Sequence, residues 1–442
     1  MKRTIIIIST AACLLSVAVN AQKILSLEQC KELALRNNTK AQNSQLSLEA
    51  AEQTRKEAFT KYFPSLSATG GGFRASNPMM EMDLPIGALL GEPDMPPVSF
   101  GMLEKGMIGA VMASQPVFAG GQIINGNRLA KIGVEAAELQ KAMTEDEIAL
   151  TVEQYYWQIV ALDEKTKTIT EAEKLLNRFH TDVKNAVEAG LANRNDLLKV
   201  ELKQNELESG KLSLANGARL LKIVLAQFIG ASPDFFEIDK SLIENVSPAF
   251  GATIDHHSAL HQRIEYQLLD KNIEANELMV KMETGKLLPT VAVGAGWNYM
   301  SFDKGSPSAM KQDFGMVFAM VSVPITDWWG GSKAIKKQKI QTQIAQNDKR
   351  NAEEMLLIQM QQLRNEVEEA VLQVQLADKA IAAALENLRL NTDYYEAGTG
   401  LLTDLLDAQN ALQQTRDQRT EAITAYCMKL ARYRQATGQR IN

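Results

Sequence analysis

The sequence predicts a mixed fold in which long α-helical coiled coils are joined to β-strands of a transmembrane barrel shared between chains. Three observations predict it. Very long stretches lack Gly and Pro, shorter segments alternate apolar with small side chains, and the two halves of the chain repeat the same order of patterns. A length of 442 residues suits one elongated chain of this kind, or two to three ordinary domains.

The chain begins with a predicted secretory signal at residues 1–21. Two basic residues precede an apolar run from Ile5 to Val19, and a small-residue cleavage site ends at Ala21. Its removal leaves 45 basic and 53 acidic residues, a net charge of about −8 that disfavours nucleic-acid partners. No run of 18 or more apolar residues follows, so we expect no membrane-spanning helix, whereas a β-barrel stays possible.

The long helices are predicted from stretches without Gly or Pro. There are 56 such residues between Gly133 and Gly190, 66 between Gly331 and Gly398, and 37 between Gly400 and the next Gly. They are rich in good helix formers, and apolar residues recur at spacings of three and four. Since 66 helical residues span about 100 Å, these segments indicate an extended coiled-coil bundle.

Four segments are predicted to be barrel strands. The pattern is clearest in Thr290–Phe302, where apolar residues from Val291 to Tyr299 alternate with small or polar ones over a length that suits a tilted strand. Ser65–Phe73 alternates poorly and is predicted mainly from its match to the second half of the chain. The remaining strands are Gly106–Phe118 and Asp313–Pro324, with loops at Arg74–Lys105 and Asp303–Gln312.

An internal duplication with an offset of 208 residues organises the chain. EAGLANRNDLL at residues 188–198 is echoed by EAGTGLLTDLL at 396–406, and the residue pairs that match are Pro116 with Pro324, Gly190 with Gly398, and Gly230 with Gly438. Gly120-Gly121 corresponds to Gly330-Gly331 after a two-residue insertion. We therefore expect a first repeat at 22–230, a linker at 231–258 and a second repeat at 259–442.

Four strands are too few to close a barrel, and open sheet edges are not tolerated in lipid. Single-chain barrels begin at about eight strands. The sequence therefore predicts that two or three chains pool their strands, while the long helices extend from one side of the barrel. This geometry is typical of a pipe rather than of a pocket.

These features together resemble the TolC family of outer-membrane efflux and secretion channels. The resemblance covers Gln22–Gln439 and rests on LSLEQCKELALRNN, YFPSLSATGGG, QPVFAGG, VPITDWWGG and the two EAG phrases in this order. It implies a homotrimer with a twelve-stranded barrel in outer-membrane lipid and a twelve-helix tunnel in the periplasm. It also implies that residues 231–258 and the chain ends form a belt around the middle of the tunnel.

The EAG phrases are the main candidate site. Gly190 and Gly398 each follow a predicted helix, where the left-handed conformation favours Gly, and Asp196 and Asp404 stand near the start of the next helix. Taken alone, this pattern is equally consistent with plain helix-turn-helix punctuation. The resemblance implies that the two turns form the tunnel entrance and dock a periplasmic adaptor through Ala189, Gly190, Leu191, Ala397, Gly398 and Thr399.

The second phrase carries a predicted acidic ring. The resemblance implies a ring of acidic residues at the tunnel entrance, which matches Asp404 and Asp407 here. Their spacing of three places both on one helix face, and a trimer would gather six carboxylates at the opening. The resemblance also implies gate contacts at Tyr395 and Asp196, but Gly400 stands where the family has an Arg. Arg194 could instead pair with Asp196 or Asp404, and the sequence leaves open how this gate is locked.

Aromatic residues mark the predicted membrane interfaces. Phe118, Trp328 and Trp329 suit the periplasmic side, whereas Trp297 and Tyr299 suit the outer end of a strand.

Other chemistry is not predicted. No catalytic motif occurs, so we expect no enzyme activity and no cofactor. His256, His257 and His261 lie close in sequence, but they lack the further ligands of a metal site and are not assigned one. Cys30 and Cys427 allow either one disulfide or two buried thiols.

The function expected from the resemblance is a passive trimeric exit duct in the outer membrane. It would serve a pump made of an inner-membrane transporter and a periplasmic adaptor (membrane fusion) protein. An alternative is the duct of a type I protein secretion system, and a more distant one is a periplasmic coiled-coil scaffold without a pore. Ducts of this family carry drugs, metal ions, metabolites and polypeptides, and the transporter largely selects among them.

Overall fold

The structure, a computed structural model, describes residues 23–86, 91–92, 94–249, 254–304 and 309–439. The predicted signal lies outside the described residues. The chain forms two compact units. The sheet unit contains Ser47–Glu138 and Leu268–Arg350, and the helical unit contains Met1–Leu46, Leu139–Gln267 and Asn351–Asn442. Each unit therefore combines segments from both predicted repeats.

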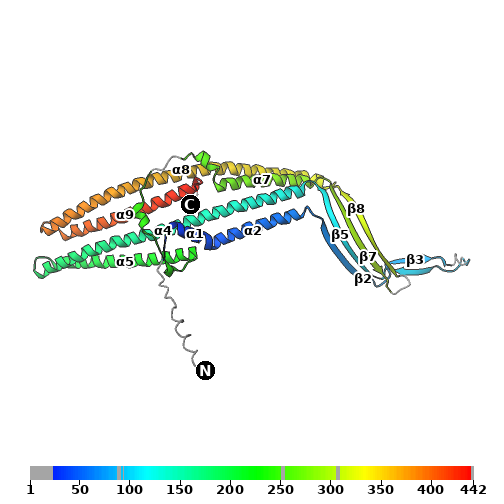
Figure 1. Cartoon of the computed structure of the whole chain (residues 1–442), viewed down its shortest axis with the longest axis horizontal. Coiled ribbons are helices and arrows are strands. Elements are labelled where there is room, and N and C mark those ends of the chain that lie inside the picture. The colour runs from blue at the N-terminus through cyan, green and yellow to red at the C-terminus, as the bar shows by residue number, and fades with distance from the viewer. Residues whose placement is uncertain (1–22, 87–90, 93, 250–253, 305–308, 440–442) are drawn as a thin grey trace, which may run out of the picture. The chain divides into compact units, whose positions relative to one another are not determined.

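The sheet unit holds the four predicted strands in one antiparallel sheet of order β2-β5-β7-β8 (Figure 1). β7 has the predicted bounds, whereas β8 begins and ends a few residues earlier than predicted. Within the described part of one chain, β2 and β8 each leave one edge unpaired. The strands are β2 Ser65–Arg74, β5 Lys105–Ala119, β7 Thr290–Phe302 and β8 Met310–Ser322.

One face of this sheet is apolar and exposed. On β7, exposed residues from Val293 to Tyr299 alternate with partly buried small residues such as Gly294 and Gly296, which confirms the predicted period of two. Val317 and Val321 of β8 pair with residues on the same face and are 86% and 65% exposed. Such a face suits contact with lipid.

The predicted loop Arg74–Lys105 is a loop only in part. β3 (Met80–Leu84) and β4 (Val98–Met102) pair antiparallel and form a separate hairpin. The prediction was wrong here because the prolines around these segments concealed two short alternating runs, and a five-residue strand leaves little periodicity to detect.

The helices confirm the duplication. α2 (Thr39–Thr60) and α7 (Ile264–Gly285) have 22 residues each. α4 (Gln122–Glu188) has 67 residues and α8 (Asp327–Glu396) has 70. They are followed by helices of 36 and 35 residues, α5 Arg194–Ile229 and α9 Leu402–Ala436.

The two matched glycine pairs differ in conformation. Gly120 and Gly121 have φ of 60° and 76° and precede α4, whereas Gly330 and Gly331 lie inside α8. Gly120 also approaches Gly285 closely, because a Cβ atom at position 120 would lie 2.1 Å from the carbonyl oxygen of Gly285. The first pair is therefore a tight turn and the second is part of a helix.

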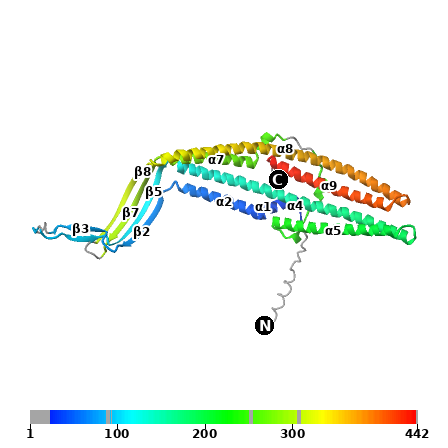
Figure 2. The ribbon, with the colours of Figure 1, turned by 180° about the vertical axis from the view of Figure 1, so that it is seen from behind.

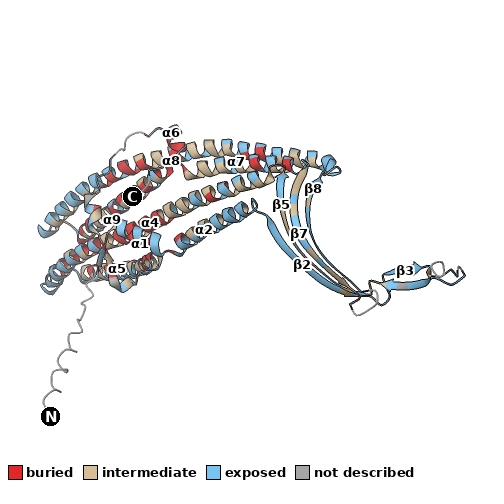
Figure 3. Cartoon of the chain, turned by 45° about the vertical axis from the view of Figure 1, so that its right-hand side comes forward, coloured by how far each residue is buried: buried red, intermediate tan, exposed pale blue. Residues whose placement is uncertain are grey.

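The core of the helical unit gathers the chain start and the linker around the long helices (Figures 2 and 3). β1 (Lys23–Leu25) pairs in parallel with β6 (Phe236–Ile238). Residues 23–37 and the described part of 231–258 are called the belt below, and their place around a tunnel stays a prediction. α1 (Leu27–Asn37) begins with a capping box at Ser26. The linker also contains the short elements η1 Pro233–Phe235, η2 Ser241–Asn245 and α6 His256–Leu260.

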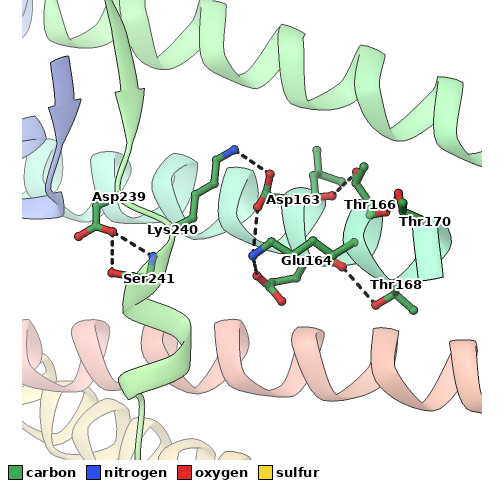
Figure 4. Close-up of polar contacts among 10 residues, drawn as sticks. Asp163, Glu164, Thr166, Thr168, Thr170, Asp239, Lys240 and Ser241 are labelled. Carbon is green, nitrogen blue, oxygen red and sulfur yellow. Dashed lines mark hydrogen bonds and ion pairs between the residues drawn. The ribbon is translucent and has the colours of Figure 1, made fainter. Parts of the chain in front are cut away.

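Polar contacts hold this belt to α4 (Figure 4). The ammonium group of Lys240 lies 2.7 Å from the Asp163 carboxylate, and the Tyr156 hydroxyl donates to the Asp239 carbonyl. Lys31 and Glu153 form a deeply buried ion pair at 2.7 Å. Burial raises the pKa of Glu153, against the lowering effect of Lys31.

The two cysteines are free thiols in this core rather than a disulfide. Burial raises the pKa of each thiol to about 12. Of the two alternatives from the sequence, the structure shows the unpaired one.

Among the described residues, one helix, α5, is long and apolar enough by length and composition alone to cross a membrane. The expectation that no helix spans a membrane rested on the lack of an uninterrupted apolar run, and α5 passes a test of length and composition only. Arg219 and Lys222 interrupt the apolar half of α5, and Lys222 pairs with Glu237 at 2.6 Å. Leu225 and Ile229 pack in the belt core, so this helix belongs to the bundle.

We predict that Gly120→Ala destabilises the sheet unit by at least about 2 kcal/mol. The new Cβ would both strain a left-handed residue and collide with the Gly285 backbone. Gly126→Ala is the matched control, since Gly126 is helical and has open space around it, and it should be neutral or stabilising by up to about 1 kcal/mol. Denaturant unfolding followed by tryptophan fluorescence measures both. Equal stability of the two variants would contradict the close approach.

Candidate functional site

Two helix hairpins, α4 with α5 and α8 with α9, turn at the same end of the helical unit (Figures 1 and 2). Gly190 and Gly398 have φ of 72° and 73° at these turns. The N–H of Leu191 donates to the Ala186 carbonyl at 2.8 Å, and the N–H of Thr399 donates to the Tyr394 carbonyl at 2.9 Å. With the bonds from the two glycines, each turn is a Schellman motif.

The second turn is too tight for a side chain at position 400. The Gly400 N–H also donates to the Tyr394 carbonyl, at 2.9 Å. A Cβ atom at position 400 would lie 2.9 Å from Tyr394 Cβ and 3.1 Å from the Tyr395 nitrogen. This backbone geometry accounts for Gly where the resemblance implies Arg.

The turns present exposed apolar side chains above a packed core. Leu191 is 84% exposed and Leu401 is 67% exposed. Beneath them a hydrophobic cluster joins the hairpins, with Leu176 and Val200 from the first and Leu405 from the second, all buried. The turns are therefore held firmly while their tips stay accessible.

The two hairpins differ in charge at matched positions. Asp196 lies in the first turn of α5 and pairs with Lys199 at 3.2 Å. Asp404 and Asp407 lie on one exposed face of α9, and no described residue forms a hydrogen bond or ion pair with either carboxylate. Lys199 thus neutralises the Asp196 carboxylate beside the first turn, whereas the second turn is followed by the two carboxylates of Asp404 and Asp407, unpaired within the described chain.

The remaining predicted gate residues, Tyr395 and Arg194, lie on either side of the two turns. Tyr395 packs against the tip cluster, and burial raises the pKa of its hydroxyl, with Asp196 and Asp182 acting in the same direction. Arg194 is exposed, and within the described part of the chain its side chain reaches neither Asp196 nor Asp404.

A polar stripe on α9 was not predicted from the sequence. Gln409, Gln413 and Asp417 follow at intervals of four, and each has a buried oxygen without a hydrogen-bond partner among the described residues. Burial raises the pKa of Asp417, against the lowering effect of Lys165. The spacing in DAQNALQQTRD was the available signal, because polar residues four apart share a helix face.

The predicted interface aromatics lie on the sheet unit. The Trp328 indole donates to the Leu287 carbonyl at 2.9 Å, and Trp329 is 84% exposed beside it in the first turn of α8. Phe118 is exposed at the end of β5. Trp297 lies near the middle of β7, and Tyr299 follows it on the same face with the Lys311 ammonium 5.8 Å from its ring.

The histidines of the 256–261 segment make structural contacts within the belt. His256 Nε2 lies 3.2 Å from the Tyr433 hydroxyl, and Asp255 caps α6 by accepting from the His257 N–H. Among the described residues, no three His, Cys, Asp or Glu side chains are placed to hold a metal ion.

Comparisons with known proteins agree on one class. The outer membrane efflux protein family model matches residues 31–227 and 257–439. The outer membrane protein VceC of Vibrio cholerae is 16% identical, with a TM-score of 0.74, 93% of this chain covered and 96% of that one. CusC is 14% identical, with a TM-score of 0.79 and coverages of 94% and 92%. The open state of the Neisseria gonorrhoeae MtrE channel is 16% identical, with a TM-score of 0.71 and coverages of 94% and 89%. No curated protein matches the sequence.

We predict that Asp417→Asn stabilises the helical unit at neutral pH. Because the native pKa of Asp417 is raised, the native state favours the protonated acid, and its stability falls as pH rises from the ordinary Asp pKa through the raised one. The stability gained by the variant should therefore be larger at pH 7 than at pH 4 in denaturant unfolding.

Asp378→Asn serves as the control for this measurement, since the exposed Asp378 pairs with Arg419 at 2.6 Å. It should change stability by less than about 1 kcal/mol. A gain for Asp417→Asn that does not depend on pH would contradict the assignment.

Proposed function

The chain belongs to the outer membrane efflux protein family, and from that premise we propose that three copies form the passive exit duct of a tripartite efflux pump. The observation that carries the proposal is the four-stranded sheet, with one exposed apolar face and two unpaired edges in the described chain. Three such sheets supply twelve strands, an even number within the range of known outer-membrane barrels. A signal removed after Ala21 accounts for export.

The long helices supply the conduit in this proposal. At about 1.5 Å per residue, the 67 residues of α4 and the 70 of α8 can span roughly 100 Å of periplasm. The helices carry no nucleotide-binding motif, so the energy for transport comes from an inner-membrane transporter. The chain itself provides the path.

The helical tips dock the periplasmic adaptor. Leu191 and the turn backbone around Gly190 and Gly398 are accessible, and the Schellman turns hold them in a defined shape. Exposed apolar residues on a rigid turn are suited to a helix hairpin of a partner, because little conformational entropy is lost on binding.

The acidic pair sets the ion preference of the entrance. Asp404 and Asp407 lack the neutralising partner that Lys199 gives Asp196. Six free carboxylates around a narrow aqueous opening attract cations and repel one another. Protonation or cation binding relieves this repulsion, and opening follows from a rearrangement of the tip helices.

We predict that Asp404→Asn with Asp407→Asn lowers the cation-to-anion permeability ratio toward about 1 in planar bilayers. The control replaces Asp196 with Asn and Lys199 with Gln together, which removes an ion pair without changing the net charge, and its ratio should stay near that of the wild type. An unchanged cation-to-anion permeability ratio in the double-Asn variant would refute the acidic ring but not the duct. Intact trimers that never conduct would refute the duct.

For the adaptor, Leu191→Asp should weaken co-purification with the adaptor about tenfold or more. Burying an unpaired carboxylate costs more than burying a neutral polar group, roughly 2 kcal/mol or more, and a tenfold loss of affinity corresponds to about 1.4 kcal/mol. Leu191→Met keeps the apolar contact and should bind as the wild type does. Both variants should form trimers in the outer membrane. Equal binding by the Asp variant would place the docking surface away from this tip.

A further inference from the structure

The β3–β4 hairpin has two chemically different faces. In its register, Met80 is opposite Met102 and Leu84 is opposite Val98, so these residues share a face with Met82. Met80, Met82, Leu84 and Val98 are between 42% and 52% exposed. The opposite face carries Glu81, Asp83 and Ser99, and the Ser99 hydroxyl donates to the Asp83 carboxylate.

The base of the hairpin is held firmly to the sheet unit. The buried Asp303 carboxylate accepts backbone N–H groups from Leu103, Glu104 and Lys105 at 2.6, 2.9 and 3.1 Å. The Ala75 N–H donates to the Glu104 carbonyl at 2.7 Å. These bonds anchor the base of the hairpin beside the end of β7.

An isolated two-stranded hairpin is at best marginally stable in water. This hairpin leaves its apolar face half exposed in one chain, and covering that face removes apolar area from water. The described elements of the same chain do not cover it. A partner in the assembly would stabilise it.

We propose that the apolar faces of three β3–β4 hairpins, one from each copy, pack together and form an outer cap over the barrel mouth. This inference rests on the proposed trimeric duct. The cap is a second constriction, distinct from the acidic ring, and it opens when the three apolar faces separate.

The length of the hairpin favours other copies of this chain as the partner that covers its apolar face. Twelve strands spaced about 4.8 Å apart and tilted by about 40° enclose a barrel of roughly 12 Å radius. A five-residue strand spans about 17 Å, and β3 and β4 have five residues each. Because the hairpin arises between β2 and β5 of every copy, three hairpins of this length can meet at the axis.

The negative charge of residues 75–103 disfavours the membrane surface as the partner that covers the apolar face. Residues 75–103 contain four acids and no Lys or Arg. Attachment to an anionic lipid surface relies on basic residues. In the cap, Glu81 and Asp83 lie on the outward face, apart from the contact and hydrated.

The test uses the full-length protein in outer-membrane fractions with a cysteine at each face. Met82→Cys should be oxidised by copper phenanthroline to covalent dimers, because two of three thiols at the axis can join. Glu81→Cys, the neighbouring residue on the opposite face, should give at least fivefold less. The parent chain, whose Cys30 and Cys427 lie in the belt core, sets the background.

A functional variant accompanies the cross-link. Met80→Glu with Met82→Glu places like charges on the apolar face and should increase single-channel conductance in planar bilayers at least twofold. Glu81→Gln on the polar face should leave it unchanged. Equal cross-linking at positions 81 and 82 together with unchanged conductance would overturn the cap.

Other occupants have separate outcomes. Quenching of a fluorophore on Met82→Cys by brominated lipid would place the face on the membrane, and a cross-link to another protein would assign it to that partner. Either result overturns the cap. Gel migration and outer-membrane fractionation of the same samples report on the duct itself. Absent trimers would refute the proposed function, whereas intact trimers without the position-82 cross-link refute only the cap.

Discussion

The backbone hydrogen bonds along the two open edges of the four-stranded sheet are the constraint on which the rest of the structure depends. In lipid, each unpaired N–H or C=O of β2 and β8 would cost several kcal/mol. A single chain cannot satisfy them, so the chain is built as a part of a larger barrel. The sheet takes two strands from each half of the sequence, which is why each compact unit combines both halves.

The duplication supplies a scaffold, and a few substitutions make its two copies chemically different. Both tips use the same backbone motif, with Gly190 and Gly398 in the same conformation and the same hydrogen bonds behind them. Charge then separates them, because Lys199 neutralises one tip and Asp407 adds to the other. The same turn geometry also explains Gly400, since its contact with Tyr394 leaves no space for a Cβ atom.

The elements predicted well are those whose patterns are long. α4, α8 and β7 repeat their period over many residues, so composition and spacing were sufficient. The β3–β4 hairpin was missed because its strands are short and flanked by prolines. The polar stripe at Gln409 and Asp417 was missed because a helix pattern does not show which polar face becomes buried against another helix.

The sequence alone determined the class of this protein. Its long helices and barrel strands each show a local periodicity of apolar residues, and its turn is duplicated. Only the tertiary structure decided what those elements do to one another. It left Asp404 and Asp407 exposed, while it buried a carboxylate oxygen of Asp417 farther along the same helix. It also kept Cys30 and Cys427 apart as thiols and used Asp303 to brace a hairpin from distant residues. These outcomes depend on distances between residues far apart in the chain, and spacing along the sequence carries no measure of such distances.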